Sequence, residues 1–226
     1  MAKLRSLVVV VLIVGLAACA QFRQTPDQLA PAVLQQSIDT LAFFRSNDDL
    51  RKINELMPDA AGVMILPRVV KGGFIAAAEA GTGVLLAHRD DGTWSYPAYY
   101  FLSGGSVGLQ LGLQETSIVM IIRTKKGLDA VIEHQGKFGA DIGVTVGWAG
   151  IGYEGSTTAG LGADIVAFSA GNLGAFGGAS LEGSALVRRG DLNDLVYGQG
   201  ATPTVILFGS LSNPMADPLR AAVRAY

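Results

Sequence analysis

Ser106–Arg123 reads SVGLQLGLQETSIVMIIR, and this stretch decides the fold class. Its first ten residues, Ser106–Glu115, place valine and leucine on one side of an extended chain and glycine or glutamine on the other. Such strict alternation is typical of a half-buried β-strand. Ser117–Arg123 then contains an unbroken apolar run, which indicates a strand near the centre of a sheet. The stretch therefore predicts a β body with a well-buried middle.

Further strands are predicted on both sides of this stretch. One lies ahead of it at Gly62–Leu66, and the others follow at Phe138–Trp148, Ala163–Ser169, Ala179–Arg189 and Thr204–Phe208. Lys71-Gly72-Gly73 and Asp91-Gly92 are typical of turns. Glycine recurs at alternate positions in several strands, and such glycines permit close backbone approach, bending or closure of a sheet.

Helices are predicted before, within and after the β body. Apolar residues recur with helical spacing over Ala32–Phe44, and either Thr25-Pro26 or Pro31 opens this helix. Asn47 caps a second helix that Pro58 ends, Thr124–Gln135 forms an inserted helix, and Asp217 caps a short last one. The expected fold is α+β: a mainly antiparallel, strongly curved sheet or partly closed barrel, with N-terminal helices, one inserted helix and a short C-terminal helix.

The N-terminus has the layout of a bacterial lipoprotein signal peptide. Lys3 and Arg5 precede an apolar run that ends in Leu16-Ala17-Ala18-Cys19, and Cys19 is the only cysteine of the chain. A membrane-spanning helix needs about 20 apolar residues, and Gln21 and Arg23 interrupt this run. The motif resembles a lipobox, which implies a diacylglycerol on the Cys19 thiol, palmitate-type acyl chains and cleavage before Cys19.

The chain is therefore expected to consist of three parts. Residues 1–18 are the signal peptide, residues 19–30 a polar tether, and residues 31–226 one domain. A chain anchored in this way belongs in the bacterial envelope. Because Ala20 and not aspartate follows Cys19, resemblance to known sorting signals places it on the outer membrane, facing the periplasm.

The charge of the chain argues against nucleic acid as a partner. Loss of residues 1–18 would leave 15 basic and 19 acidic residues, a net charge of −4. Non-specific binding to DNA or RNA depends on an excess of basic residues that this body lacks.

No enzyme motif, metal-ligand pattern or cofactor motif stands out from the residues. Gly104-Gly105-Ser106-Val107-Gly108 matches the G-x-S-x-G elbow of serine hydrolases, but that motif needs a helix after the serine, and a strand pattern follows here. His88 and His134 are the only histidines, and they lie far apart in the chain. No phosphate loop is present, and Gly81-Thr82-Gly83 lacks the third glycine of a dinucleotide fingerprint. We therefore expect a protein without catalytic residues, metal or cofactor, and keep a hydrolase using Ser106 as a minor alternative.

Seven short segments carry a family resemblance across residues 61–198. They are Ala61–Pro67, Val70–Phe74, Gly81–Leu85, Trp94–Ala98, Gly105–Gly112, Phe176–Gly183 and Tyr197-Gly198. In this order they resemble the SYLF domain family. The resemblance implies a lipid-binding module whose eukaryotic members associate with phosphoinositide membranes and, in some cases, with actin. Bacterial members are often predicted lipoproteins or secreted proteins, and actin is set aside as a partner in a bacterial envelope.

Arg68, Lys71, Gly72 and Gly73 are the candidate lipid-binding residues. Backbone amides of a glycine turn can form an anion-binding concavity, and two basic residues beside it would attract a lipid phosphate. The function expected from the sequence is a non-enzymatic envelope lipoprotein whose domain contacts membrane lipid, with anionic headgroups favoured, or an envelope protein partner. The alternative is a periplasmic carrier that holds one apolar small molecule in a β cavity.

Overall fold

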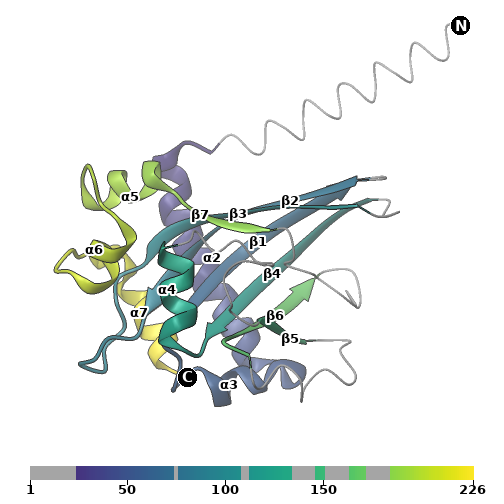
Figure 1. Cartoon of the computed structure of the whole chain (residues 1–226), viewed down its shortest axis with the longest axis horizontal. Helices are drawn as coiled ribbons and strands as arrows, with labels where there is room; N and C mark the ends of the chain where they lie inside the picture. The colour runs from purple at the N-terminus through teal and green to yellow at the C-terminus, as the bar shows by residue number, and fades with distance from the viewer. Residues whose placement is uncertain (1–23, 74–75, 108–111, 134–145, 151–162, 172–183) are drawn as a thin grey trace, which may run out of the picture.

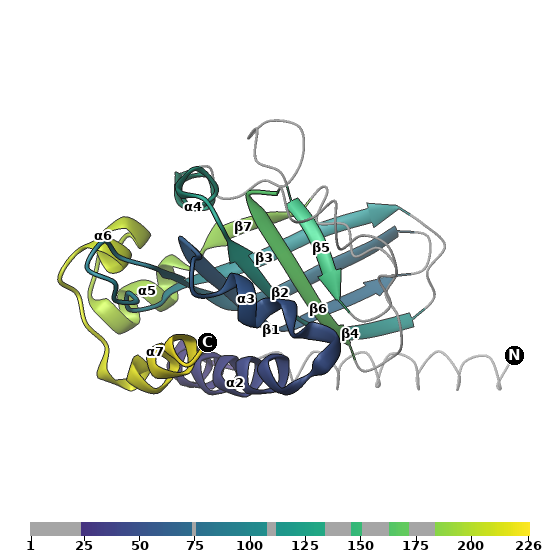
Figure 2. The same cartoon turned by 90° about the horizontal axis from the view of Figure 1, so that it is seen from below.

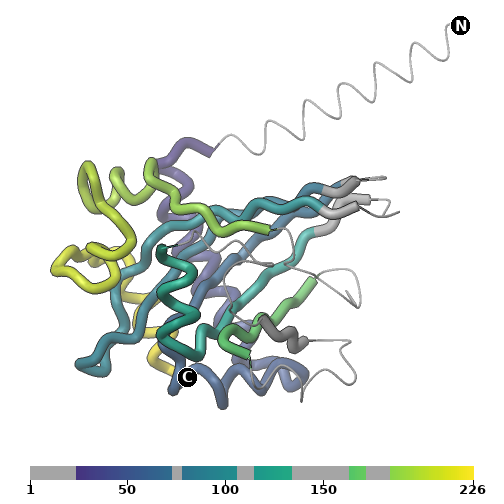
Figure 3. Tube along the Cα trace, viewed as in Figure 1, coloured from purple at the N-terminus to yellow at the C-terminus, as the bar shows by residue number. Residues whose placement is uncertain are grey.

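The computed structural model describes residues 24–73, 76–107, 112–133, 146–150, 163–171 and 184–226, and the remaining residues are drawn in grey (Figures 1 and 3). The helices are α2 (Pro26–Ser46), η1 (Asp48–Leu50), α3 (Lys52–Leu56), α4 (Lys125–Glu133), α5 (Gly190–Tyr197), α6 (Pro203–Phe208), η3 (Pro214–Ala216) and α7 (Asp217–Arg224). The strands are β1 (Gly62–Gly73), β2 (Ala76–Ala87), β3 (Ala98–Val107), β4 (Gly112–Ile122), β5 (Val146–Gly150), β6 (Ile165–Gly171) and β7 (Ala185–Arg188).

All seven strands form one mixed sheet in the order β5-β6-β4-β1-β2-β3-β7. Every neighbouring pair is antiparallel except β5 and β6, which are parallel. The α+β class and the mainly antiparallel sheet are confirmed. A barrel is not: within the described residues β5 and β7 are the two ends of an open sheet. The predicted central strand Ser117–Arg123 corresponds to the second half of β4, and β1 lies beside it at the middle of the sheet.

The continuous strand predicted over Ser106–Glu115 is wrong. Strand β3 ends at Val107 and β4 begins at Gly112. Since β3 is antiparallel to β2 and β4 is antiparallel to β1, these two strands lie on opposite sides of the β1–β2 pair. Strands β3 and β4 therefore run in opposite directions. The alternation of apolar residues with glycine or glutamine does not reveal this, because it has the same period of two in both strands.

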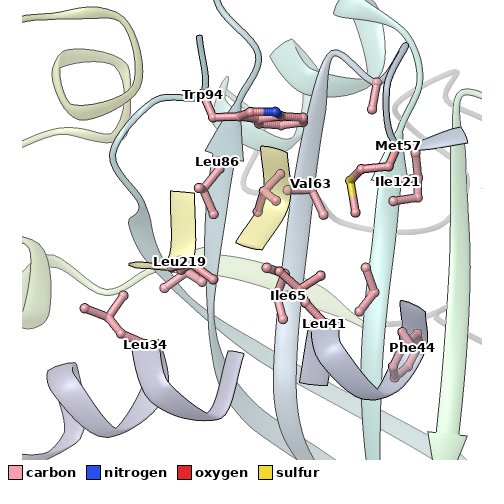
Figure 4. Packing of buried hydrophobic residues seen from close by; sticks show 14 of the residues in the cluster. Leu34, Leu41, Phe44, Met57, Val63, Ile65, Leu86, Trp94, Ile121 and Leu219 are labelled. Atoms are coloured by element: carbon pink, nitrogen blue, oxygen red, sulfur yellow. The ribbon is translucent and has the colours of Figure 1, made fainter. Parts of the chain in front are cut away.

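The sheet is covered by helices on both faces (Figure 2). On one face α2, α3 and α7 pack on side chains such as Val63, Ile65 and Ile121 (Figure 4). On the other face α4 and α6 pack on side chains such as Met64 and Tyr100. Alternate residues of each central strand therefore enter two separate cores, which explains the continuous apolar runs in β1 and β4.

A bulge in β1 changes which residues face α2. The pairing register of β1 with β2 shifts between Ile65 and Arg68, and Pro67 lies in this interval. Proline has no backbone N–H to give to a sheet, so it is tolerated at a bulge. Before the bulge Ile65 faces the α2 core, and after it Val69 faces the opposite core. The bulge therefore turns Arg68 toward α2, because side chains alternate along a strand.

Glycines 81 and 83 make room for this bulge from β2. A Cβ on Gly83 would lie 2.2 Å from the carbonyl oxygen of Ile65, and one on Gly81 would lie 2.6 Å from that of Arg68. Gly81 and Gly83 thus permit close backbone approach, in a strand that the sequence analysis did not predict.

One expected helix start is confirmed and one expected strand is wrong. Helix α2 begins at Pro26 with Thr25 before it, the earlier of the two starts expected, so residues 26–30 are helical. Thr204–Phe208, predicted as a strand, lies in helix α6. The Thr202 side chain accepts a hydrogen bond from the Val205 N–H and Pro203 occupies the first turn, a helix start that outweighs the strand preference of valine and isoleucine.

The stability of the fold is expected to fall steeply above about pH 10. Burial raises the pKa of Tyr99, Tyr100, Tyr197 and Tyr226 in the folded chain. In the unfolded chain these phenols ionise near the ordinary pKa of 10.0, so the unfolded state releases its protons first and is stabilised relative to the folded state as the pH rises. Urea unfolding between about pH 8.5 and about pH 11 measures this effect.

Tyr100→Phe is the matched control for the alkaline effect. The Tyr100 hydroxyl is buried and has no hydrogen-bond partner among the described residues, so its removal should cost little and should make the loss of stability less steep. An unfolding free energy that stays constant up to about pH 11 would contradict the burial of these phenols.

Candidate functional site

All four predicted lipid-binding residues lie in strand β1. Lys71, Gly72 and Gly73 pair with Glu79, Ala78 and Ala77 of β2, and with Gln114, Leu113 and Gly112 of β4. The prediction of a turn at Lys71-Gly72-Gly73 is therefore wrong. Because β1 has a partner strand on each side, the backbone amides of these glycines do not form an open concavity.

The structure separates Arg68 from Lys71. Residues three apart in a strand point to opposite faces of the sheet, so only Arg68 points toward α2. The Nε atom of Arg68 lies 2.8 Å from Glu115 Oε2, and both side chains are nearly half exposed. Lys71 is in register with Glu79 on the other face. The two basic residues do not form one site, and their role in lipid binding stays a prediction.

Arg68 instead shares a hollow with a residue that the sequence did not single out, Arg189. We call it the Arg68–Arg189 hollow, and it has a volume of about 340 Å³. It is lined by Gln24, Leu29, Val33, Gln36, Arg68, Val70, Ala80, Gly81, Thr82, Phe101 and Arg189. The first turns of α2 thus lie against the middle of β1, β2 and β3, next to the start of α5 (Figure 1).

Three hydrogen bonds hold the Arg189 side chain in place. Its Nε and Nη2 atoms donate to the two carboxylate oxygens of Asp191 at 2.8 and 2.7 Å, and its Nη1 atom donates to Thr82 Oγ1 at 3.0 Å. The hydrogen bond from Arg189 is the main reason why the pKa of Asp191 lies below its usual value. A two-pronged pair of this kind fixes the plane of the guanidinium group.

The lining of the hollow combines cations with apolar surface. In the part of the lining that the structure describes, Arg68 and Arg189 are the only charged residues, since the carboxylates that pair with them, Glu115 and Asp191, are not part of it. The apolar part comes from α2 on one side and from the sheet on the other. Such a surface can bind an anionic group and an adjoining hydrocarbon segment together.

The sequence contained only a faint indication of Arg189. It ends the predicted strand Ala179–Arg189, and the structure places β7 there at Ala185–Arg188. The hollow forms because β7 pairs with β3, which brings Arg189 beside Thr82 from far along the chain. No local pattern predicts such a long-range pairing.

The other candidates have structural positions or lie outside the described residues. Cys19 and His134 are among the residues that the structure leaves undescribed. Ser106 lies inside β3 in register with Ala77, and not at a turn from strand to helix. The ring of His88 stacks on Trp94 at 4.8 Å between centroids. In the described part of the chain, no helix is both long enough and apolar enough to span a membrane.

The family model described as "Ysc84: Las17-binding protein actin regulator" matches residues 103–226, which is more than half of the chain. The chain belongs to the Ysc84 family. This result confirms the SYLF resemblance of the sequence. The matched Ysc84 region includes the end of the sheet that carries Arg189, together with α5, α6 and α7.

Curated relatives that carry the Ysc84-type region are similar over most of this chain. LAS seventeen-binding protein 3 of Saccharomyces cerevisiae is 33% identical over 169 residues, which are 73% of this chain and 36% of that protein. SH3 domain-containing protein PJ696.02 of Schizosaccharomyces pombe is 34% identical over 167 residues, 73% of this chain and 39% of that protein.

A mammalian relative shows the same partial coverage. SH3 domain-containing YSC84-like protein 1 of Bos taurus is 33% identical over 156 residues, which are 69% of this chain and 45% of that protein. The chain therefore spans less than half the length of these curated relatives.

Proposed function

We propose that this Ysc84-family chain is a non-enzymatic lipoprotein of the bacterial envelope whose folded domain contacts membrane lipid. A diacylglycerol on Cys19, with its two acyl chains, would anchor it on the outer membrane, facing the periplasm. The support for anchoring is the order of charged residues, apolar run and Leu16-Ala17-Ala18-Cys19 in the sequence. A single acyl chain gives only marginal membrane binding, whereas two or more give a stable anchor.

The observation that carries lipid contact is the Arg68–Arg189 hollow. It combines two arginines with apolar side chains, as a lipid headgroup and its first methylenes require. It also lies beside Gln24, only a few residues after Cys19. A fully extended chain covers at most about 3.6 Å per residue, so a membrane anchor at Cys19 would keep the hollow within about 20 Å of the lipid surface.

The attraction to anionic lipid must be local. The mature chain would carry a net charge of −4, so the whole molecule does not favour an anionic surface. Each basic residue near such a surface contributes about 1 kcal/mol, and salt screens the contribution. Replacing Arg68 or Arg189 would also leave Glu115 or Asp191 without its partner, which adds repulsion.

We expect a soluble variant of residues 24–226 to float weakly with anionic vesicles at low salt. Arg68→Gln combined with Arg189→Gln should reduce the bound fraction at least about tenfold, because two cations are lost and two carboxylates are unmasked. Salt at about 1 M, where the Debye length is about 3 Å, should release the wild-type variant as well. Vesicle flotation measures both effects.

The matched control replaces two exposed arginines outside the hollow, Arg188→Gln and Arg224→Gln. It changes the net charge equally and should keep more than half of the flotation. If the hollow variant and the control float equally well, the hollow is not the contact, and if the wild-type variant never floats, intrinsic lipid binding is excluded.

A protein partner is the second candidate, and one observation favours it. Exposed apolar side chains gather late in the chain on α5, α6 and η3, where Leu195, Val205, Phe208 and Met215 are 52%, 48%, 49% and 66% exposed. No charged residue occurs from Gly198 to Ala216. The printed name of a yeast relative also describes it as a binding protein. Failure of flotation would favour an envelope protein at this surface.

A further inference from the structure

We propose that the Arg68–Arg189 hollow binds one molecule of a single-chain amphipathic anion, with Arg189 holding the acidic group and the apolar lining holding the acyl chain. This inference rests on the proposed lipid contact and narrows it from a membrane surface to one ligand in one place. Fatty-acid carboxylate and lysophosphatidate phosphate share this chemistry.

The guanidinium group of Arg189 is held in a fixed orientation and has donors left to bind an acidic group. A guanidinium group has five N–H donors in a fixed plane, and the three bonds to Asp191 and Thr82 use one donor on each of its three nitrogens. Further donors on Nη1 and Nη2 remain for a ligand. The Arg189 side chain is only 23% exposed, so an anion bound there would be partly shielded from water and its hydrogen bonds strengthened.

The charge of the lining favours an acid over a base or a neutral head. Among the described residues, the lining has two cations and no carboxylate, and Asp191 approaches Arg189 from outside it. The amide side chains of Gln24 and Gln36 add polar groups elsewhere in the lining, and the Thr82 hydroxyl lies beside Arg189. A carboxylate or phosphate at Arg189 would therefore meet N–H donors of the guanidinium group next to a polar hydroxyl.

The apolar lining provides a place for a hydrocarbon chain. Leu29 and Val33 of α2 face Val70 and Ala80 of the sheet across the hollow, and Phe101 of β3 adds an aromatic side chain. Val33 is 2% exposed, so it already belongs to the core on which a chain would lie. Burying methylenes there contributes about 0.8 kcal/mol each.

The size of the hollow indicates one chain and not two. Its volume of about 340 Å³ lies at the lower end of the range of about 300 to 1,000 Å³ found for ligand pockets. A small hollow of this kind suits part of one chain with its head. Two-chain phospholipids would have to remain in the membrane and contact only the rim.

The test uses the full chain with Cys19 intact, purified and reconstituted in neutral phosphatidylcholine vesicles. Three probes carry the same photoreactive diazirine on the same chain: palmitate, palmitoyl lysophosphatidate and the neutral ester methyl palmitate. After illumination, mass spectrometry locates the labelled residues. We expect label from an acidic probe on α2 near Leu29 and Val33 and on β3 near Phe101.

Two kinds of variant separate the acid from the chain. Arg189→Gln should reduce labelling by the acidic probes about tenfold, Arg189→Lys should restore part of it, and Arg188→Gln should leave it unchanged. Ala80→Phe should block labelling without changing any charge, because Ala80 is exposed and a larger side chain would fill the hollow. Circular dichroism checks that each variant is folded.

Labelling by palmitate, by lysophosphatidate or by both supports the proposal and identifies the acidic head. The proposal is overturned if methyl palmitate labels the hollow equally well, if label appears only elsewhere, or if folded Arg189→Gln and Ala80→Phe label like the wild type. Flotation of the soluble variant is measured separately, so vesicle binding without label in the hollow would overturn this inference and leave the proposed function standing.

Discussion

Gly83→Ala is expected to lower the free energy of unfolding by about 3 kcal/mol or more. The new Cβ would lie 2.2 Å from the Ile65 carbonyl oxygen and 2.8 Å from Leu66 Cδ2. The carbonyl belongs to the backbone of β1, so relief of the clash requires the two central strands to move apart at the bulge. Denaturant unfolding followed by circular dichroism measures the loss.

Gly190→Ala is the control for this substitution. A Cβ at Gly190 meets no atom of the described residues within 4 Å, and the residue starts helix α5, where alanine is favoured. Its unfolding free energy should stay within about 0.5 kcal/mol of the wild type. An unfolding free energy of Gly83→Ala equal to that of Gly190→Ala would contradict the close packing of β2 on the Pro67 bulge.

Asn193→Ala is expected to cost about 2 to 4 kcal/mol of folding free energy. Asn193 is fully buried on α5, where its Oδ1 accepts from the Tyr99 N–H at 2.8 Å and its Nδ2 donates to the Tyr99 carbonyl at 3.2 Å. The side chain thus continues the edge of the sheet beyond the last residue of β7. Alanine would leave the Tyr99 N–H buried without a partner and create a cavity.

Two further variants test the reason for this loss. Asn193→Asp has the same shape but turns the Nδ2 donor into an acceptor that faces the Tyr99 carbonyl, so it should be at least as damaging as alanine. Leu195→Ala, on the exposed side of the same helix, should change stability by less than about 0.5 kcal/mol. Equal stability of Asn193→Ala and Leu195→Ala would contradict the pairing with Tyr99.

The central strands of the sheet were predictable because a continuous run of apolar residues in the sequence indicates a strand that is buried on both faces. Of the predicted strand Ser117–Arg123, all residues up to Ile122 lie in β4 between β6 and β1, as a strand buried on both faces should. Ala163–Ser169 corresponds to β6 for the same reason. Thr25-Pro26 marks the start of α2, because that dipeptide favours the first turn of a helix.

The predictions were wrong where the pattern of apolar and polar residues fits more than one structure. They were also wrong where the structure depends on contacts between residues far apart in the sequence. The alternation over Ser106–Glu115 could not reveal a reversal, since strands before and after a turn share the period of two. Thr204–Phe208 is a short apolar run, and burial of Ile206 and Leu207 against the sheet decides in favour of a helix.

Of the two arginines in the Arg68–Arg189 hollow, the sequence singled out only Arg68 as a candidate. The phase change at Pro67 that separates Arg68 from Lys71 depends on how β1 pairs with β2. Arg189 joins the hollow only through the pairing of β7 with β3 and its bond to Thr82. These are tertiary contacts between residues far apart in the sequence, which local periodicity does not encode.

The mass of the mature chain, isolated from membranes, tests the proposed envelope lipoprotein most directly. We predict a chain that begins at Cys19 and carries acyl groups on that residue, and we predict that Cys19→Ser remains an unprocessed, unacylated precursor. A mature chain that is unmodified and begins at another residue would contradict the account.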